Sequence, residues 1–280
     1  MASHFSVGEY QRPIGLLDSG IGGLTVAKAL SDRLPHEHLV FFGDTTHLPY
    51  GDKSAASIRR FTARVAQYLI TEWDCKAIVI ACNTASAVAG SYLRKRFQKT
   101  DVQWYDVIQP AVQFIAGRPE TKKVGIIGTR RTIASRAYPR RLRALRPDMQ
   151  VRSLTTSLLA PMIEEGFFNN RISQTIIEWY LKKPPLRDIQ LLLLGCTHYP
   201  LIQQEIERFL QQKVIVLDSA QAVAVHIARD LAQKRLLNPE AATRINRFLV
   251  SDFTQSFQRT AQMFFGQQVY LDEVRLPSVD

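Results

Sequence analysis

The chain has 280 residues, 46% of them hydrophobic and 22% charged, which is typical of a globular protein and excludes a disordered or fibrous chain. Its formal net charge of +11 leaves nucleic acid, an anionic membrane surface or a small anionic ligand open as partners. No apolar run approaches the roughly 20 residues of a membrane span, and no secretory signal is visible. The sequence contains 3 cysteines, which are too few for a disulfide scaffold, so we expect a cytoplasmic protein with reduced thiols.

The first half of the chain alternates predicted strands with predicted helices. Residues 1–12 are expected to form a loose tail. Short apolar runs then predict strands at 14–17, 39–42 and 77–81. Helical patterns start near Gly23, after Ser54, which could cap the helix, and after Cys82. Residues 45–53 are expected to form a loop.

The second half repeats this order. Apolar runs predict three more strands, at 124–127, 191–194 and 214–217. An arginine-rich helix is expected after Thr129, broken or bounded near Pro139, and Pro200 suits the first turn of a later helix. Strands that alternate with helices favour an α/β fold with mostly parallel sheets.

Two short segments also recur between the halves. Residues 14–17 resemble 124–127, and 80–84 resemble 194–197, so that a cysteine follows the same predicted strand in each half. The repeat predicts two pseudo-symmetric, doubly wound domains. We expect one domain to comprise 1–105 plus 219–280 and to carry Cys82, and the other to comprise 106–218 and to carry Cys196.

Polar side chains lie at the ends of these strands, where open α/β sheets bind their ligands. Cys82 and Cys196 are each followed by small polar residues and the start of a helix, whose amide groups favour a thiolate. Cys75 begins a strand instead and is interpreted as a buried structural thiol.

Three other chemistries can be weighed from the residues alone. A zinc site is poorly supported because there is no CxxC pair and no second Cys–His cluster near Cys196 and His198. A Cys–His hydrolase, with His198 activating Cys196, leaves Cys82 unexplained. The glycines at 20–23 follow a strand, but Thr25 stands where a dinucleotide loop needs its third glycine.

The basic stretch after the fourth predicted strand has two interpretations. It contains six arginines and no acidic residue: Arg130, Arg131, Arg136, Arg140, Arg141 and Arg143. It could bind an anion or nucleic acid, or it could be a solvated helix face or an interface with acidic residues elsewhere. We favour the second interpretation, because no aromatic stacking platform or nucleic-acid module accompanies it.

Seven segments, in order along nearly the whole chain, resemble the glutamate racemases, a cofactor-independent branch of the aspartate/glutamate racemase superfamily. They are LDSGIGG at 17–23, GD at 43–44, LPYG at 48–51, ACNTAS at 81–86, GIIGT at 125–129, GCTHYP at 195–200 and DS at 218–219. The chain departs from the pattern at 154–160, which lacks a cysteine that many members have, and at Ala220, which replaces a glycine.

The resemblance implies interconversion of L- and D-glutamate for peptidoglycan synthesis, without pyridoxal phosphate, other cofactor or metal. It implies an active site in the cleft between the two domains, where Cys82 and Cys196 are the two catalytic thiols and exchange roles with the handedness of the substrate. It also implies that Asp18 and His198 assist these thiols. The substrate-binding residues it implies are Asp18, Ser19, Tyr50, Gly51, Asn83, Thr84, Thr129, Thr197 and His198, with Glu164 as an acidic helper. Glutamate and a second copy of the chain, in a homodimer, are the expected partners; a membrane and nucleic acid are not.

Overall fold

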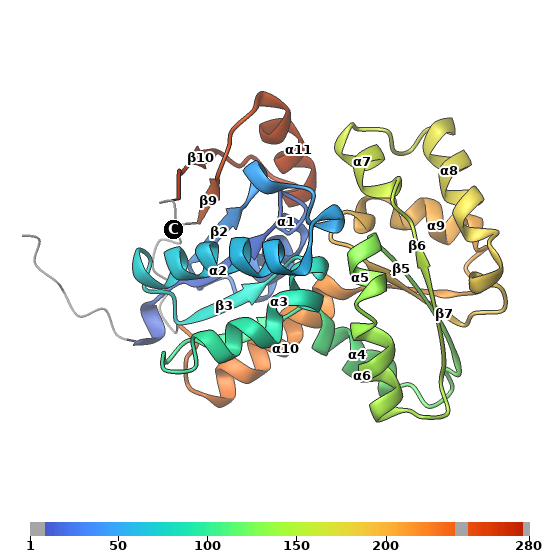
Figure 1. Ribbon diagram of the computed structural model, residues 1–280, viewed down its shortest axis with the longest axis horizontal. Helices are drawn as coiled ribbons and strands as arrows, with labels where there is room; N and C mark the ends of the chain where they lie inside the picture. The colour runs from blue at the N-terminus through green and yellow to red at the C-terminus, as the bar shows by residue number, and fades with distance from the viewer. Residues whose placement is uncertain (1–8, 239–245, 277–280) are drawn as a thin grey trace, which may run out of the picture.

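The structure is a computed structural model that describes residues 9–238 and 246–276. Its strands form two separate sheets, and Figure 1 shows them in two lobes side by side. Most of the tail expected at 1–12 lies outside the described residues, and its last part forms a short 3₁₀ turn at Glu9–Gln11.

All neighbouring strands in both sheets run parallel. The six-stranded sheet has the order β10 (Leu271–Glu273), β9 (Arg247–Val250), β2 (Leu39–Gly43), β1 (Ile14–Asp18), β3 (Ala77–Ile80) and β4 (Gln103–Asp106). The four-stranded sheet has the order β6 (Gln150–Thr155), β5 (Lys123–Gly128), β7 (Leu191–Gly195) and β8 (Ile215–Asp218). The predicted α/β class with parallel sheets is confirmed.

The helices connect these strands. They are α1 (Leu24–Arg33), α2 (Ala55–Thr71), α3 (Asn83–Arg96), α4 (Ile108–Ala116), α5 (Arg130–Ala134), α6 (Ala137–Leu145), α7 (Leu159–Glu164), α8 (Arg171–Leu181), α9 (Gln203–Phe209), α10 (Ser219–Gln233) and α11 (Gln255–Phe265). Four further 3₁₀ turns lie at Thr45–His47, Tyr50–Asp52, Pro184–Leu186 and Tyr199–Ile202. The Ser54 cap is observed, because its hydroxyl accepts the Ser57 amide at 3.1 Å.

Both faces of the six-stranded sheet are covered. Successive residues of a strand point to opposite faces, and neighbouring Phe41 and Phe42 belong to two different hydrophobic clusters. Leu30 of α1 packs in the first cluster, whereas Leu69 of α2 packs in the second. Such two-sided burial explains why the strands are continuous apolar runs rather than alternating patterns.

The two sheets share one strand order. In each, the chain moves from the first strand to a neighbour on one side and then crosses to the other side, giving 2-1-3-4 in one sheet and 6-5-7-8 in the other. β3 and β7 therefore occupy equivalent places beside β1 and β5. Cys82 follows β3 and Cys196 follows β7, which places both thiols where the direction of winding reverses and ligands bind in such sheets.

After β8 the chain returns to the first lobe. Helix α10 packs against α1, and β9 adds to the edge of β2. On this division of strands we propose the domain boundaries expected from the sequence, with 1–105 and 219–280 in one domain and 106–218 in the other.

The arginine-rich helix is broken close to the predicted place, a few residues before Pro139. The arginine-rich segment is interrupted at Ser135 and Arg136, where Arg136 adopts a φ of 55°, and not at Pro139. Pro139 lies inside the first turn of α6, where a missing amide costs no helical hydrogen bond. Among the described residues, no helix has the length and apolar character needed to cross a membrane.

Candidate active site

A cavity of about 260 Å³ lies between the two lobes. All of the residues that the sequence suggested for the site line it, except Asp18. They come from the ends of β1, β3, β5 and β7, from the 3₁₀ turn at Tyr50–Asp52 and from α7. Its further lining residues, which the sequence analysis missed, are Gly20, Leu48, Pro49, Ala160 and Pro161.

Cys82 is the first-lobe thiol. It precedes the first residue of α3, its sulfur accepts the Ala85 amide at 3.4 Å, and the Ser19 hydroxyl lies 3.4 Å away. Burial, helped by the negative charge of Asp18, raises the pKa of Cys82 to about 12. Cys82 therefore carries its proton at neutral pH and stands as a proton donor facing the cavity.

Asp18 lies behind the cavity wall rather than in it. Its Oδ2 accepts the Gly20 amide at 3.0 Å, and a side chain at Gly23 would collide with it, since a Cβ there would come within 2.7 Å of the Asp18 Cβ. Its Oδ1 is buried and has no hydrogen-bond partner among the described residues. Burial raises the pKa of Asp18, against the opposing charge of His198. An unpartnered carboxylate oxygen near a thiol can accept the proton of that thiol.

The second-lobe thiol has a basic neighbour. The Cys196 sulfur lies 3.6 Å from Nδ1 of His198, and Nε2 of His198 contacts Oε1 of Glu164 at 2.8 Å. Burial opposes a charge on His198, but the neighbouring Cys196 and Glu164 outweigh it and hold the pKa of His198 well above its usual range. A protonated imidazole 3.6 Å from the Cys196 sulfur places a positive charge beside this second thiol, whereas the charge nearest Cys82 is the negative one of Asp18.

Polar residues from the two lobes meet at the side of the cavity. The Thr84 hydroxyl lies 2.9 Å from that of Thr129 and 3.1 Å from that of Thr132. Asn83 donates from Nδ2 to the Tyr138 hydroxyl at 2.7 Å, and its Oδ1 is buried without a partner among the described residues. That oxygen is available to a donor on a ligand, such as an ammonium group.

Comparison with known proteins decides the family. A family model described as Asp/Glu/Hydantoin racemase matches residues 24–227. A glutamate racemase of Neisseria meningitidis serogroup C is 42% identical over 258 residues, which cover 92% of this chain and 94% of that protein. The chain belongs to the Asp/Glu/Hydantoin racemase family.

Solved structures of the family agree with the fold. The crystal structure of glutamate racemase from Francisella tularensis in complex with D-glutamate has a TM-score of 0.88 and 37% identity, covering 95% of this chain and 98% of that one. The glutamate racemase from Thermus thermophilus in complex with beta-chloro-D-alanine has a TM-score of 0.84, again at 37% identity and with coverage of 95% and 98%.

One residue that contacts His198 gave only a partial signal in the sequence. Gly22 belongs to the glycine run considered for a dinucleotide loop, but its neighbour is the imidazole of the other lobe, since a Cβ at Gly22 would come within 2.5 Å of His198 Nδ1. The run was visible, whereas its contact across the cleft was not. Among the described residues, no three His, Cys, Asp or Glu side chains are grouped so that they could hold a metal ion.

Proposed function

We propose that this chain is a glutamate racemase that interconverts L- and D-glutamate through Cys82 and Cys196. The observation that supports it best is the placement of two thiols, one from each lobe, on one small cavity. Racemisation needs a base on one face of the α-carbon and an acid on the other, and a cavity of about 260 Å³ suits a small metabolite better than a drug-sized ligand.

The reaction needs only these two groups and a means to hold the intermediate. For one enantiomer the Cys196 thiolate takes the α-proton, the C–H electron pair stays on the α-carbon and its carboxylate, and the Cys82 thiol gives its proton to the opposite face. For the other enantiomer the roles are exchanged. Hydroxyls such as those of Ser19 and Thr197 and the amino end of α3 stabilise the negative charge as it spreads onto the carboxylate.

Asp18 and His198 manage the protons of the thiols in this proposal. Asp18 has a buried oxygen with no hydrogen-bond partner among the described residues, and its negative charge acts on the Cys82 thiol. His198 contacts the Cys196 sulfur directly. Asn83, Thr84 and Thr129, with the Tyr50–Gly51 main chain, bind the ammonium and carboxylate groups of the substrate. Glu164 holds His198 in its protonated form.

A Cys–His hydrolase is the alternative with an observation in its favour, because Cys196, His198 and Glu164 follow one another at 3.6 and 2.8 Å. Such an enzyme would need Cys196 only. It would leave the second thiol on the same cavity without a role.

Serine substitutions at each cysteine separate the two proposals. We expect Cys82→Ser and Cys196→Ser each to abolish the change in circular dichroism of a D- or L-glutamate solution, in both directions. Cys75→Ser is the matched control, because Cys75 is fully buried away from the cavity and should be dispensable. Near-normal racemisation by Cys82→Ser would contradict the two-thiol mechanism and favour the hydrolase.

The wider setting follows from the same proposal. We propose that the enzyme acts in the cytoplasm, where its three free thiols stay reduced, and supplies D-glutamate for peptidoglycan synthesis. A homodimer is supported by exposed apolar side chains on α8, Ile172 and Trp179, and sedimentation of the purified protein tests it. Nucleic acid is not a proposed partner, because Arg141 pairs with Asp106 and Arg131 donates to the Lys53 carbonyl within the chain.

A further inference from the structure

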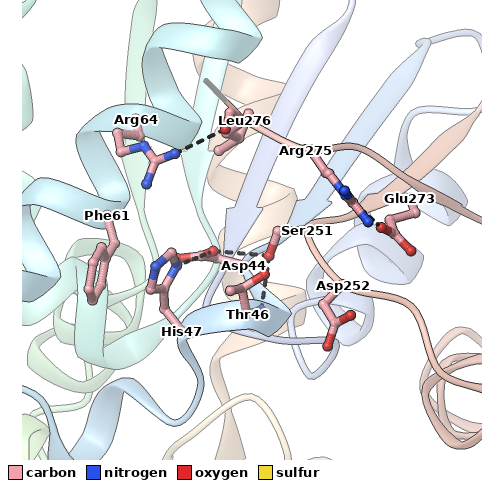
Figure 2. A pocket seen from close by; sticks show the side chains of 10 residues that line it. All are labelled: Asp44, Thr46, His47, Phe61, Arg64, Ser251, Asp252, Glu273, Arg275 and Leu276. Carbon is pink, nitrogen blue, oxygen red and sulfur yellow. Dashed lines mark hydrogen bonds and ion pairs between the residues drawn. The ribbon is translucent and has the colours of Figure 1, made fainter. Parts of the chain in front are cut away.

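Figure 2 shows a second cavity, of about 430 Å³, whose lining includes Asp44, His47 and Ser251. A hydrogen bond from Tyr50, which lines the catalytic cavity, to Asp44 links the two cavities. At the floor of the second cavity is Asp44, which directly follows β2 and is buried. Three side chains contact its carboxylate: the Tyr50 hydroxyl donates to Oδ2 at 2.6 Å, the Ser251 hydroxyl donates to Oδ1 at 3.1 Å, and His47 Nδ1 lies 2.8 Å from Oδ1. Because a carboxylate only accepts, His47 Nδ1 carries the proton in this contact.

Tyr50 connects this cluster to the catalytic cavity. It lines that cavity together with Pro49 and Gly51, while its hydroxyl points away from the cavity toward Asp44. Burial and the charge and hydrogen bond of Asp44 hold the pKa of Tyr50 well above its usual range, so Tyr50 stays neutral although the Cys82 thiol is close enough to affect it.

The opposite side of the same segment touches the second lobe. A Cβ on Gly51 would come within 3.0 Å of the Thr129 side chain, and Arg131 donates to the Lys53 carbonyl at 3.0 Å. The 49–53 segment thus lies between the Asp44 cluster and the lobe that carries Cys196. A shift of Tyr50 would change the distance between the walls that face the two thiols.

Two further contacts hold the cluster itself. The Ser251 hydroxyl accepts the Thr46 amide at 3.0 Å, and the His47 ring stacks on Phe61 with ring centroids 3.9 Å apart. Ser251 directly follows β9 and lies 207 residues after Asp44 in the chain. A segment distant in the sequence therefore fixes the turn after β2.

We propose that Asp44 is a positioning residue of the racemase site. Through the Tyr50 hydroxyl it holds the 49–51 segment as the cavity wall over Cys82, and Ser251 and His47 keep its carboxylate in place. Asp44 does not touch the reacting atoms. The kinetic part of this inference rests on the proposed function, whereas the part concerning the wall over Cys82 does not.

The test compares Tyr50→Phe and Asp44→Asn, singly and combined. Tyr50→Phe removes the hydrogen bond, whereas Asp44→Asn removes the charge and one of the two acceptor oxygens, so that Tyr50 competes with Ser251 and His47 for the oxygen that is left. Both changes alter the side-chain volume little. We expect KM for glutamate to rise about tenfold with a smaller change in kcat, since one hydrogen bond of this kind is worth roughly a factor of ten. The double variant should raise KM no more than the single variant with the larger effect, because both substitutions act on the same contact. Ser251→Ala should show a smaller effect in the same direction.

Tyr105→Phe is the matched control. The Tyr105 hydroxyl donates to Asp230 at the same 2.6 Å, but this pair lies between β4 and α10, away from the cavity. The variant loses an equivalent bond and should keep the wild-type KM. Equal effects of Tyr50→Phe and Tyr105→Phe on KM, or additive effects in the double variant, would overturn the proposal.

A second readout does not need turnover. The rate of Cys82 alkylation by iodoacetamide, followed by mass spectrometry with Cys75 as internal reference, should rise at least about threefold in Tyr50→Phe and Asp44→Asn and stay unchanged in Tyr105→Phe. If the wild-type protein does not racemise glutamate, the proposed function fails, and alkylation still decides the positioning role. Unchanged alkylation in both variants would then overturn it. If Asp44→Asn does not fold, Tyr50→Phe and Ser251→Ala give the same decision.

Discussion

His198 packs directly against the main chain of the opposite lobe. A Cβ at Gly22 would lie 2.5 Å from two atoms of the imidazole and 2.6 Å from the Thr197 hydroxyl. No real side chain fits at such distances, so position 22 must be glycine for the imidazole to reach both Cys196 and Glu164. The requirement is one of space, because Gly22 does not have a positive φ.

We therefore expect Gly22→Ala to displace His198 and to lower kcat/KM for glutamate by about 100-fold, the effect of roughly a 1 Å misplacement of a catalytic group. Steady-state kinetics measure it, with far-ultraviolet circular dichroism to check folding. Gly90→Ala is the control, since a Cβ there meets nothing closer than 3.5 Å and the helix gains from alanine. Wild-type kcat/KM in Gly22→Ala would show that the contact is unimportant.

The charge on Glu164 sets the pH range of His198. Glu164→Gln keeps an acceptor 2.8 Å from His198 Nε2 but removes the charge that helps to raise the pKa of His198. Protonated His198 persists until the pH exceeds its raised pKa, so activity that needs it falls on the alkaline side. We expect this alkaline limb of kcat/KM to move about one pH unit lower in Glu164→Gln.

The raised pKa of His198 also determines how the stability of the fold depends on pH. A raised histidine pKa contributes stability that is fully present below the ordinary histidine value and is lost as the pH rises through the folded-state pKa. Glu164→Gln should therefore narrow the pH range over which this contribution persists. Glu165→Gln, at the exposed neighbouring position, should leave the pH profile unchanged; an identical shift in both variants would point to a general charge effect instead.

At the scale of elements, a buried ion pair fastens the returning chain to the first lobe. Lys76 Nζ lies 2.6 Å from Glu37 Oε2, with both side chains almost fully buried, and donates to the Leu236 carbonyl at 2.7 Å. Glu37 also accepts the Asn238 amide at 2.8 Å. The pair thus joins the start of β3, the turn before β2 and the end of α10.

Lys76→Met should lower the free energy of unfolding by about 3–5 kcal/mol, because it leaves the Glu37 carboxylate buried without a countercharge. Urea unfolding followed by fluorescence measures this. Lys28→Met removes an exposed pair with Asp32 one helical turn away and should cost less than about 1 kcal/mol. Equal losses in the two variants would contradict the role of burial.

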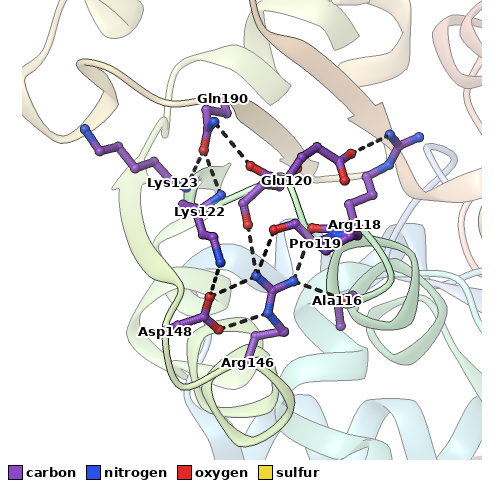
Figure 3. A network of polar contacts seen from close by, with 10 residues as sticks. Ala116, Arg118, Pro119, Glu120, Lys122, Lys123, Arg146, Asp148 and Gln190 are labelled. Carbon is purple, nitrogen blue, oxygen red and sulfur yellow. Dashed lines mark hydrogen bonds and ion pairs between the residues drawn. The ribbon is translucent and has the colours of Figure 1, made fainter.

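A second element-scale contact orders the connection into β5 (Figure 3). Arg146, which follows α6, donates its guanidinium to four main-chain carbonyls, those of Ala116, Arg118, Pro119 and Thr121. Asp148 accepts from the same guanidinium at 2.9 Å and from Lys122 at 2.7 Å. One side chain thereby donates hydrogen bonds to main-chain carbonyl groups at and after the end of α4, and it fixes where the chain enters the second sheet.

For the whole molecule, the site depends on contacts between the lobes. The Tyr138 hydroxyl of α6 accepts a hydrogen bond from the side-chain amide of Asn83, a residue that lines the cavity. Thr25 of α1 donates to the Thr197 carbonyl at 3.2 Å. Cys82 and Cys196 are almost fully buried, at 5% and 8% exposure, although both line the cavity between the lobes.

We expect Tyr138→Phe to raise KM for glutamate about tenfold, because the Asn83 amide loses the partner that orients it. Initial-rate kinetics with both enantiomers measure the change, and thermal unfolding shows whether the fold is intact. The control is again Tyr105→Phe. Tyr105 is also buried, and its hydroxyl donates a hydrogen bond to Asp230 away from the cavity. An unchanged KM would mean that Asn83 is oriented by other contacts.

The sequence by itself determined the elements and the chemistry that they carry. Buried parallel strands such as 39–42 and 191–194 are continuous apolar runs, and the polar residues that end them must lie at one edge of a sheet. The repeated order of strand, cysteine and helix therefore predicted both lobes and both thiols. The seven family segments named the reaction class.

Only the tertiary structure decided which residues lie next to the two cysteines and to the segments that line their cavity. Asp18 proved to lie behind the wall, Gly22 to face the imidazole of the other lobe, and Ser251 to reach Asp44 from the end of β9. The break at Arg136 likewise follows from a local left-handed turn that the proline did not signal. Periodic patterns report which face of an element is buried, whereas contacts between distant segments arise from the packing of whole elements and leave no local pattern in the chain.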